Sequence, residues 1–326
     1  MAGRPHARQT IVNPNDVVLP RRRNEAFNMS SLLPEISEPN DCLQWLARRR
    51  LIRNSYTCPT CQQLCSLTVH NGNIDGKRWR CQGCNMQKSV RDGSFFSGSH
   101  LTLKQIVILM YCWSHDMPQN LIMHETDIGS WRIIVDWCNF MREECQVWLT
   151  NNNDEIGGMD ANGEPIVVEI DESKYFHRKY HRGQWRDGHW VFGGVERHSG
   201  KCFLVEVPDR SAATLQPLIQ QYILPGTHII SDGWAAYANI DAIRNGIYMH
   251  SVIVHQHNFV DPQDPDVHTE YVENMWMRAK RKLRRQFGTS RALFTSYLHE
   301  FMYRNKFRGQ DMFQEFMQTV AENYVL

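Results

Sequence analysis

The chain lacks long apolar runs and an excess of charge of either sign. No stretch of its 326 residues approaches the roughly 18 apolar residues that a membrane-spanning helix needs. The first residues also lack the apolar segment of a secretory signal. We therefore expect neither a membrane protein nor a secreted one. The formal net charge is only +1, so overall charge says nothing about partners.

The composition does allow a sizeable core, because 42% of the residues are hydrophobic. The length favours two or three domains. Residues 1 to about 30 are polar, contain several prolines and show no periodicity, which is typical of a mobile arm. Basic residues are clustered in Arg21 to Arg23, Arg48 to Arg50, Arg178 to Arg182 and Arg278 to Arg285.

Four of the ten cysteines form two CxxC pairs, Cys58 with Cys61 and Cys81 with Cys84. Nineteen residues separate the pairs, as in a zinc ribbon. Four thiolates at this spacing close a structural Zn²⁺ site with no open position. Cys65 is a surplus cysteine that competes as a ligand, although its spacing fits less well. The sequence therefore predicts zinc and a reducing compartment rather than a disulfide scaffold.

Basic side chains flank the two cysteine pairs on short strand-like segments. Arg78, Arg80 and Lys88 are the cations, and Trp79 lies among them. DNA binding by this ribbon is one interpretation. A purely structural or dimerising ribbon is the other, and the residues do not separate the two.

Three helices are expected after the ribbon. Apolar residues repeat at helical spacing from Thr102 to Ser114, Pro118 can begin a short helix, and Ser130 can cap a third one. Three helices with short turns suit a helix-turn-helix module. A plain three-helix linker domain is the alternative.

Two apolar, strand-like runs each deliver one aspartate. Ile166 to Ile170 leads to Asp171, and His228 to Ser231 leads to Asp232. Oxygen ligands of this kind suit Mg²⁺, and two ions in one site support phosphoryl transfer. The alternative is that each aspartate merely caps a turn.

The expected element order is three strands, a helix, a strand, a helix, a strand and a helix. This order is ribonuclease-H-like: an α/β fold whose mixed five-stranded sheet carries crossover helices. After the first strand the elements are strands His189 to Glu196 and Lys201 to Val207, a helix from Ser211 to Tyr222, the Asp232 strand, a helix near Trp234 to Asn245, a strand from Ser251 to His255, and a long helix capped by Thr269 that carries Glu273 in its first turn.

At these positions the sequence resembles the IS1595 (ISXO2-like) DDE transposases, and most of all the eukaryotic Merlin group. The similarity spans about Cys58 to Arg304. It is carried by Asp171-Glu172-Ser173-Lys174, Lys179-Tyr180-His181-Arg182-Gly183, Trp190-Val191-Phe192-Gly193-Gly194, Pro208-Asp209-Arg210-Ser211-Ala212, Ser231-Asp232-Gly233-Trp234, Asn258-Phe259-Val260-Asp261-Pro262, His268-Thr269, Val272-Glu273 and Trp276.

The resemblance implies that Asp171, Asp232 and Glu273 form the catalytic acidic triad and hold two Mg²⁺ or Mn²⁺ ions. Sixty and forty residues separate the three acids. Relatives commonly have Asn-Thr-Ile before the last acid, whereas this chain has Glu270-Tyr271-Val272. Glu270 is thus an alternative to Glu273, which we prefer because Trp276 and the basic helix follow it.

The implied function is cut-and-paste transposition of DNA. The enzyme would cleave at transposon terminal inverted repeats, and the freed 3′-hydroxyl would attack target DNA. The ribbon and the helical module would read the repeats, in at least a dimer, and we expect a nuclear location. The rivals are a domesticated DNA-binding protein without transposition activity and a ribonuclease-H-like nuclease without strand transfer.

Beyond the ribbon, two further segments are predicted to bind DNA. One is the basic loop with Arg178, Lys179, His181 and Arg182, and the other is the helix face with Lys280, Arg281 and Arg284. The expected domains are a flexible basic arm with a short helix (1–54), the zinc ribbon (55–100), the helical module (101–150), the catalytic domain (160–290) and C-terminal helices (291–326).

Overall fold

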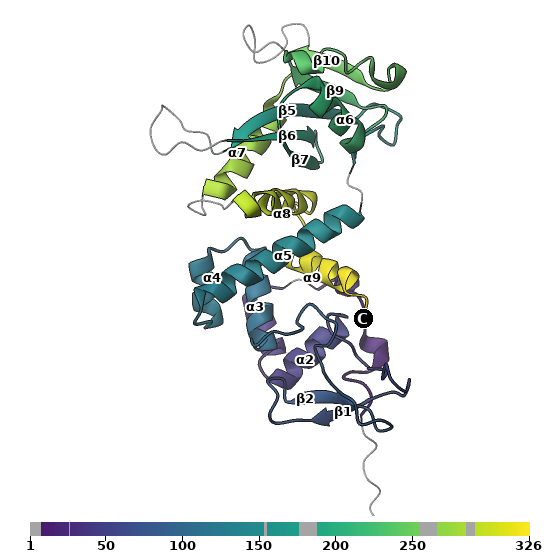
Figure 1. The fold of residues 1–326 in the computed structure, drawn as a ribbon, viewed down its shortest axis with the longest axis vertical. Helices are drawn as coiled ribbons and strands as arrows, with labels where there is room; N and C mark the ends of the chain where they lie inside the picture. The colour runs from purple at the N-terminus through teal and green to yellow at the C-terminus, as the bar shows by residue number, and fades with distance from the viewer. Residues whose placement is uncertain (1–7, 26, 153–154, 176–187, 254–265, 285–290) are drawn as a thin grey trace, which may run out of the picture. The chain divides into compact units, whose positions relative to one another are not determined.

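A computed structural model describes residues 8–25, 27–152, 155–175, 188–253, 266–284 and 291–326. The chain forms two compact units (Figure 1). The first unit comprises Met1–Glu144 and Gly309–Leu326, and the second comprises Cys145–Arg308. Over the described ranges, no helix combines the length and the hydropathy needed to cross a membrane.

From Arg8 onward the N-terminal segment packs within the first unit. The expectation that residues 1 to about 30 form a mobile arm is therefore wrong for the described part of this segment. The Ile11 amide donates to the Asn54 carbonyl at 3.0 Å, and Ile11 and Val12 are buried. Burial of these two apolar side chains offsets part of the conformational entropy that the segment loses. The elements that follow are η1 (Pro14–Asp16), η2 (Pro20–Arg23), α1 (Met29–Glu35) and α2 (Pro39–Arg48).

The ribbon is a three-stranded antiparallel sheet, which confirms the predicted fold of this region. Trp79 in its central strand is fully buried and stacks on Tyr56 with ring centroids 6.4 Å apart. A small sheet of this kind has little other core. Its strands are β1 (Ser66–Val69), β2 (Lys77–Arg80) and β3 (Gln87–Ser89).

Three helices follow at the predicted positions. The first is held by a capping box, in which Thr102 and Gln105 satisfy each other's backbone amides. Pro118 is the N-cap of the second. The helices are α3 (Leu103–Ser114), α4 (Gln119–Thr126) and α5 (Trp131–Asn151). The C-terminal segment is divided between the units, since α9 (Met312–Asn323) belongs to the first and α8 (Phe294–Lys306) to the second.

The second unit contains the predicted mixed five-stranded sheet. Its strand order is β10-β9-β5-β6-β7, with β5, β6 and β7 antiparallel and β5, β9 and β10 parallel. This is the ribonuclease-H-like topology, so the fold class is confirmed. The strands are β5 (Val167–Tyr175), β6 (His189–Glu196), β7 (Cys202–Val207), β9 (His228–Asp232) and β10 (Met249–Ile253), beside a small parallel pair β4 (Ile156–Gly157) and β8 (Ile223–Leu224).

Helices cover both faces of this sheet (Figure 1). Consecutive residues of β6 show the division, because their side chains point to opposite faces of the sheet: Val191 packs in one core cluster and Phe192 in another. The Phe192 cluster includes Leu215 and Ile219 of α6 (Ala212–Tyr222). The Val191 cluster includes residues of α7 (Glu270–Arg284) and of α8.

Two expectations about this unit were wrong. The strand carrying Asp171 does not end there, because β5 continues to Tyr175 by pairing with β6. The helix expected near Trp234 to Asn245 is replaced by two short 3-10 helices, η3 (Ala235–Tyr237) and η4 (Ile243–Asn245). Arg244 and Asn245 have positive φ angles of 46° and 63°, which an α-helix does not accommodate.

Candidate functional site

Two of the predicted acids lie next to each other on adjacent parallel strands. The register pairs Glu169 of β5 with Ile230 of β9, so Asp171 and Asp232 each stand two residues further along. Because side chains alternate along a strand, both acids face the α7 side of the sheet. Sequence alone predicted the two strand positions, and the topology makes them neighbours.

The electrostatics of this pair are unfavourable without a cation. Burial above all, with the nearby charges of Glu172 and Asp232, raises the pKa of Asp171 to about 7. The Trp276 indole N–H donates to Asp171 Oδ2 at 3.0 Å and favours the charged form. Burial and the Asp232 charge also raise the pKa of Glu172. Concentrated negative charge of this kind fits a divalent-metal site.

Helix α7 brings the third acid to the same region through three contacts with alternate residues of β5. The Val272 amide donates to Glu169 Oε2 at 3.0 Å. One helical turn later Trp276 binds Asp171, and one turn after that Lys280 Nζ donates to Ser173 Oγ. The helix therefore runs alongside the strand in a fixed register.

This register distinguishes the two candidate glutamates. Glu273 lies between the first two contacts, and the Thr269 hydroxyl donates to its Oε1 at 3.4 Å. Glu270 lies beyond the first contact, about 4.5 Å further from Asp171 along the helix axis. Both glutamates are exposed. The geometry therefore favours Glu273 as the partner of Asp171 and Asp232.

The carboxylate oxygens of the three acids are not as close to one another as the sulfurs of the four cysteines are. Among the described residues, the four predicted cysteines are the set whose ligand atoms all lie within 4.8 Å of one another, and the acids form no such set. We call Asp171, Asp232 and Glu273 the acidic site, and Cys58, Cys61, Cys81 and Cys84 the cysteine site.

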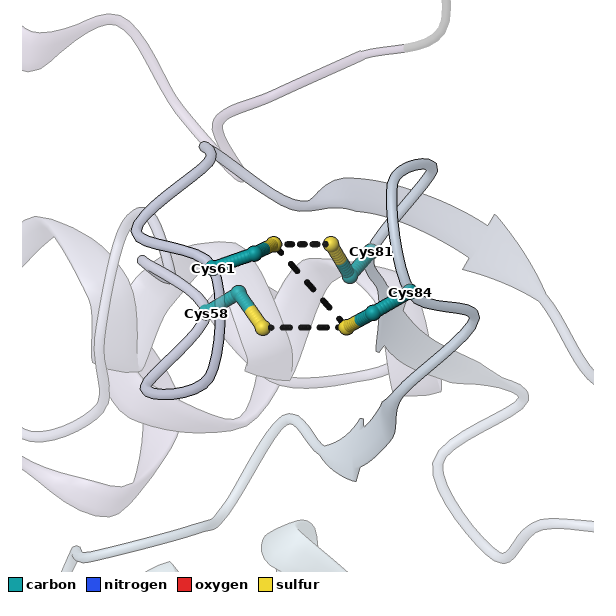
Figure 2. A group of neighbouring side chains, drawn as sticks. All are labelled: Cys58, Cys61, Cys81 and Cys84. Carbon is teal, nitrogen blue, oxygen red and sulfur yellow. Dashed lines mark hydrogen bonds between the residues drawn. The ribbon is translucent and has the colours of Figure 1, made fainter.

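The cysteine site is assembled from two loops that point their sulfurs at a common centre (Figure 2). The Sγ atoms of Cys58 and Cys84 are 3.4 Å apart, and those of Cys61 and Cys81 are 3.2 Å apart. Tetrahedral zinc with Zn–S bonds of about 2.3 Å requires sulfurs about 3.8 Å apart. The donor set and its spacing therefore suit Zn²⁺.

Two details concern the individual thiols of this region. Although burial opposes it, the backbone amides of Cys61 and Thr60 lower the pKa of Cys58 to about 6, which favours the thiolate that metal needs. Cys65 is buried outside the set, and burial raises its pKa to about 11. The choice of ligands by spacing thus agrees with the geometry.

The predicted DNA-contacting cations differ in their surroundings. On the ribbon Arg80 is exposed and donates to Asn85, whereas Lys88 pairs with Asp92 at 3.3 Å. Arg78 is half-buried on β2. On α7, Lys280 is half-buried against Ser173, while Arg281 and Arg284 are exposed. The basic loop with Arg178, Lys179, His181 and Arg182 lies outside the described residues.

Two residues beside the acidic site were missed by sequence reasoning. Glu169 has 0% of its surface exposed, and Arg197, which follows β6, has 7%. Arg197 Nε donates to Glu169 Oε1 at 2.7 Å. The available signal was Glu169 as the single acid in the apolar run Ile166 to Ile170, since an acid is rarely buried unless it is paired.

Comparison with known proteins identifies the second unit. Residues 157–306 match the ISXO2-like transposase domain. A protein of Haemophilus influenzae described as an uncharacterized transposase-like protein is 28% identical over 104 residues, which is 32% of this chain and 80% of that protein. This part of the chain is thus similar to an ISXO2-like transposase domain, in agreement with the family resemblance of the sequence.

Solved structures with some similarity are retroviral integrases. The catalytic core of HTLV-2 integrase in complex with magnesium is 14% identical with a TM-score of 0.29, covering 42% of this chain and 83% of that one. The catalytic core of BIV integrase is 15% identical with a TM-score of 0.30, covering 44% and 84%. The fold assignment itself stands on the strand order and register.

Proposed function

We propose that this chain is a DNA transposase that cleaves at transposon terminal inverted repeats and joins the ends to target DNA. The observation that carries the proposal is the acidic site: Asp171 and Asp232 lie on neighbouring strands in a region that matches an ISXO2-like transposase domain, and α7, the helix with Glu273, is hydrogen-bonded to Asp171 through Trp276. A domesticated DNA-binding protein without transposition activity would not need these acids in this arrangement.

The acids are proposed to hold two Mg²⁺ or Mn²⁺ ions, with Asp171 and Asp232 as the central ligands and Glu273 completing the site. When bound, such ions activate water or a 3′-hydroxyl and neutralise charge at the scissile phosphate. The Trp276 indole fixes the Asp171 carboxylate in place through its hydrogen bond. Orientation of this kind is a large part of catalysis in such sites.

The first unit is proposed to supply DNA recognition. Zn²⁺ at the cysteine site would hold the ribbon, and the exposed Arg80 on β2 gives this surface a cation for a phosphate. With α3 to α5 it would read the terminal repeats. Pairing of two transposon ends implies a dimer or higher oligomer, and action on chromosomal DNA implies a nuclear location.

Single substitutions in the acidic site test the proposal. Asp171→Asn, Asp232→Asn and Glu273→Gln should each abolish cleavage of terminal-repeat DNA with Mg²⁺ or Mn²⁺, while affinity for that DNA stays nearly unchanged. Glu270→Gln is the matched control and should keep its activity. An active Glu273→Gln enzyme beside an inactive Glu270→Gln one would reassign the third acid.

Two outcomes would favour the rivals. Binding of the wild-type protein to repeats without any cleavage would indicate a domesticated DNA-binding protein. Cleavage without joining of pre-cleaved ends to a target plasmid would indicate a nuclease that does not perform strand transfer. Activity in Asp171→Asn or Asp232→Asn would overturn the mechanism.

A further inference from the structure

The start of α7 is fastened to the sheet by two buried charges that the proposed catalytic roles do not use. Glu169 Oε2 accepts the Val272 amide at 3.0 Å, which is one of the amides left without a partner in the first turn of a helix. Its other oxygen accepts Arg197 Nε at 2.7 Å. The strand thus supplies a carboxylate cap to a helix that begins 101 residues later.

Arg197 fastens the segment before the helix in the same way. Its Nη1 donates to the Asp266 carbonyl at 2.6 Å, and its Nη2 donates to the His268 carbonyl at 2.9 Å. Its guanidinium also lies over the Tyr271 ring, 5.7 Å from the centroid. One planar fork therefore holds residues before and within the first turn, which lysine cannot reproduce.

We propose that Glu169 and Arg197 are positioning residues, which we call the Glu169–Arg197 clamp, and that they set where Glu273 stands relative to Asp171 and Asp232. Glu273 is the residue after Val272, and Glu169 is two residues before Asp171 on the same strand face. A shift of the helix start would therefore move the third acid directly. This inference rests on the proposed function of the acidic site.

The chemistry supports orientation as well as stability. A buried carboxylate at a helix N-terminus meets the positive end of the helix dipole, and its bonds to an amide and a guanidinium are charge-assisted. Truncating one partner leaves the other charge buried and unpaired. Groups that orient metal ligands in this way typically change metal affinity by about 10–100-fold when they are replaced.

The test compares the clamp with a second buried ion cluster, which joins the last turn of α7 to α8. Glu300 Oε1 accepts Lys282 Nζ of α7 and Arg304 Nε, each at 2.8 Å, at the opposite end of α7 from Glu273. Glu300→Gln is therefore the matched control for loss of a buried acid. The clamp variants are Glu169→Ala, Glu169→Gln and Arg197→Lys.

Two readouts are measured on full-length protein. Calorimetry measures the Mn²⁺ concentration at which the protein is half-saturated. We expect Glu169→Ala and Arg197→Lys each to raise this concentration by roughly tenfold or more. We also expect faster hydrogen exchange of amides in 266–273. Glu169→Gln keeps an acceptor oxygen for Val272 and should lie between wild type and Glu169→Ala. Glu300→Gln should lower the melting temperature without changing Mn²⁺ affinity.

The outcomes separate this inference from the proposed function. If wild-type protein binds Mn²⁺ and shows the exchange pattern but cuts no DNA, the proposed function fails and the clamp stands. If clamp variants and Glu300→Gln change Mn²⁺ affinity equally, or if Glu169→Ala binds Mn²⁺ like wild type, the clamp is only structural. If Glu169→Ala does not fold, Arg197→Lys and Glu169→Gln decide the matter by the same measurements.

Discussion

The cysteine site and the acidic site are built in opposite ways. All four sulfurs come from a segment of 27 residues, and two tight loops bring them within 4.8 Å of one another. The acids come from two strands and a helix, and Asp171 and Glu273 are 102 residues apart. The first site is thus a product of local structure, and the second is a product of tertiary packing.

This difference teaches where each site is vulnerable. Removing one sulfur removes a ligand and, with it, the folding energy of the ribbon. The acidic site depends in addition on residues that bind no metal, namely the side chains that fix α7 on β5. Trp276 is the clearest case, because it packs in the core and also binds Asp171.

The largest expected effect is on the cysteine site. Cys81→Ser should abolish stoichiometric zinc and unfold the ribbon, since structural zinc contributes about 10–16 kcal/mol in small zinc domains. Elemental analysis measures the metal, and hydrogen exchange over 55–100 measures the fold. Cys65→Ser is the control and should keep one zinc. A folded, zinc-free wild-type ribbon would contradict the assignment.

A smaller effect is expected where the acidic site depends on close packing. Gly193 is opposite Asp171 on β6, and an added Cβ would lie 2.7 Å from Trp276 Cη2 and 2.8 Å from Leu204 Cδ2. Gly193→Ala should cost about 1–3 kcal/mol through overpacking and should also reduce cleavage by displacing Trp276. Denaturant unfolding measures the first and a cleavage assay the second.

Gly129→Ala is the matched control for this change, because an added Cβ there meets nothing within 4 Å. It should leave both stability and cleavage close to wild type. A Gly193→Ala protein as stable and active as wild type would show that the indole has room to move, and that its position matters less than the structure indicates.

Sequence reasoning predicted the parts of the acidic site that have a local pattern. The β-branched runs indicated the strands before Asp171 and Asp232, and the Thr269 cap indicated the start of the helix that carries Glu273. It did not predict where β5 ends, because the extension to Tyr175 depends on pairing with β6.

The contacts between elements had no signal of this kind. The Glu169 carboxylate accepts a hydrogen bond from the amide of Val272, 103 positions later in the chain, and no periodicity of the sequence connects the two residues. The helix expected near Trp234 to Asn245 failed for a different reason. Its apolar residues suited a helix, but two short 3-10 helices form there, and the left-handed backbone at Arg244 and Asn245 accounts only for the end of the expected helix.

The pH dependence of metal-free stability is expected to be smaller again. Because the pKa of Asp171 is raised from 3.8 to about 7 in the folded state, ionisation opposes folding. The wild-type protein should therefore lose stability relative to Asp171→Asn as the pH rises from about 4 to about 7. For a half-buried carboxyl we expect about 1–2 kcal/mol.

Urea unfolding of both proteins in a chelator at several pH values measures this difference. Mn²⁺ should reverse the loss in the wild type alone, because the metal replaces the proton on the carboxylate. Parallel stability curves for the two proteins would mean that the Asp171 carboxyl titrates normally.

The smallest effect is expected for cations outside both sites. Arg281 and Arg284 are exposed on the last turn of α7, so we expect each to contact phosphate without helping to build the acidic site. Arg284→Ala should weaken binding about equally on terminal-repeat and unrelated DNA, and should reduce the slope of log K against log salt by about 0.9.

Lys280→Ala sharpens the comparison between the two kinds of cation. Lys280 binds Ser173 and lies 5.2 Å from the Tyr175 ring centroid, so it is part of the α7–β5 contact as well as a charge. We expect its loss to flatten the salt slope to a similar degree and also to raise the Mn²⁺ requirement of cleavage. Titrations of DNA at several salt concentrations, beside cleavage at several Mn²⁺ concentrations, separate the two effects. An Arg284→Ala protein that lost affinity for the terminal repeat alone would show that this arginine reads bases. A Lys280→Ala protein with a wild-type Mn²⁺ requirement would show that the contact of Lys280 with β5 does not position the acids.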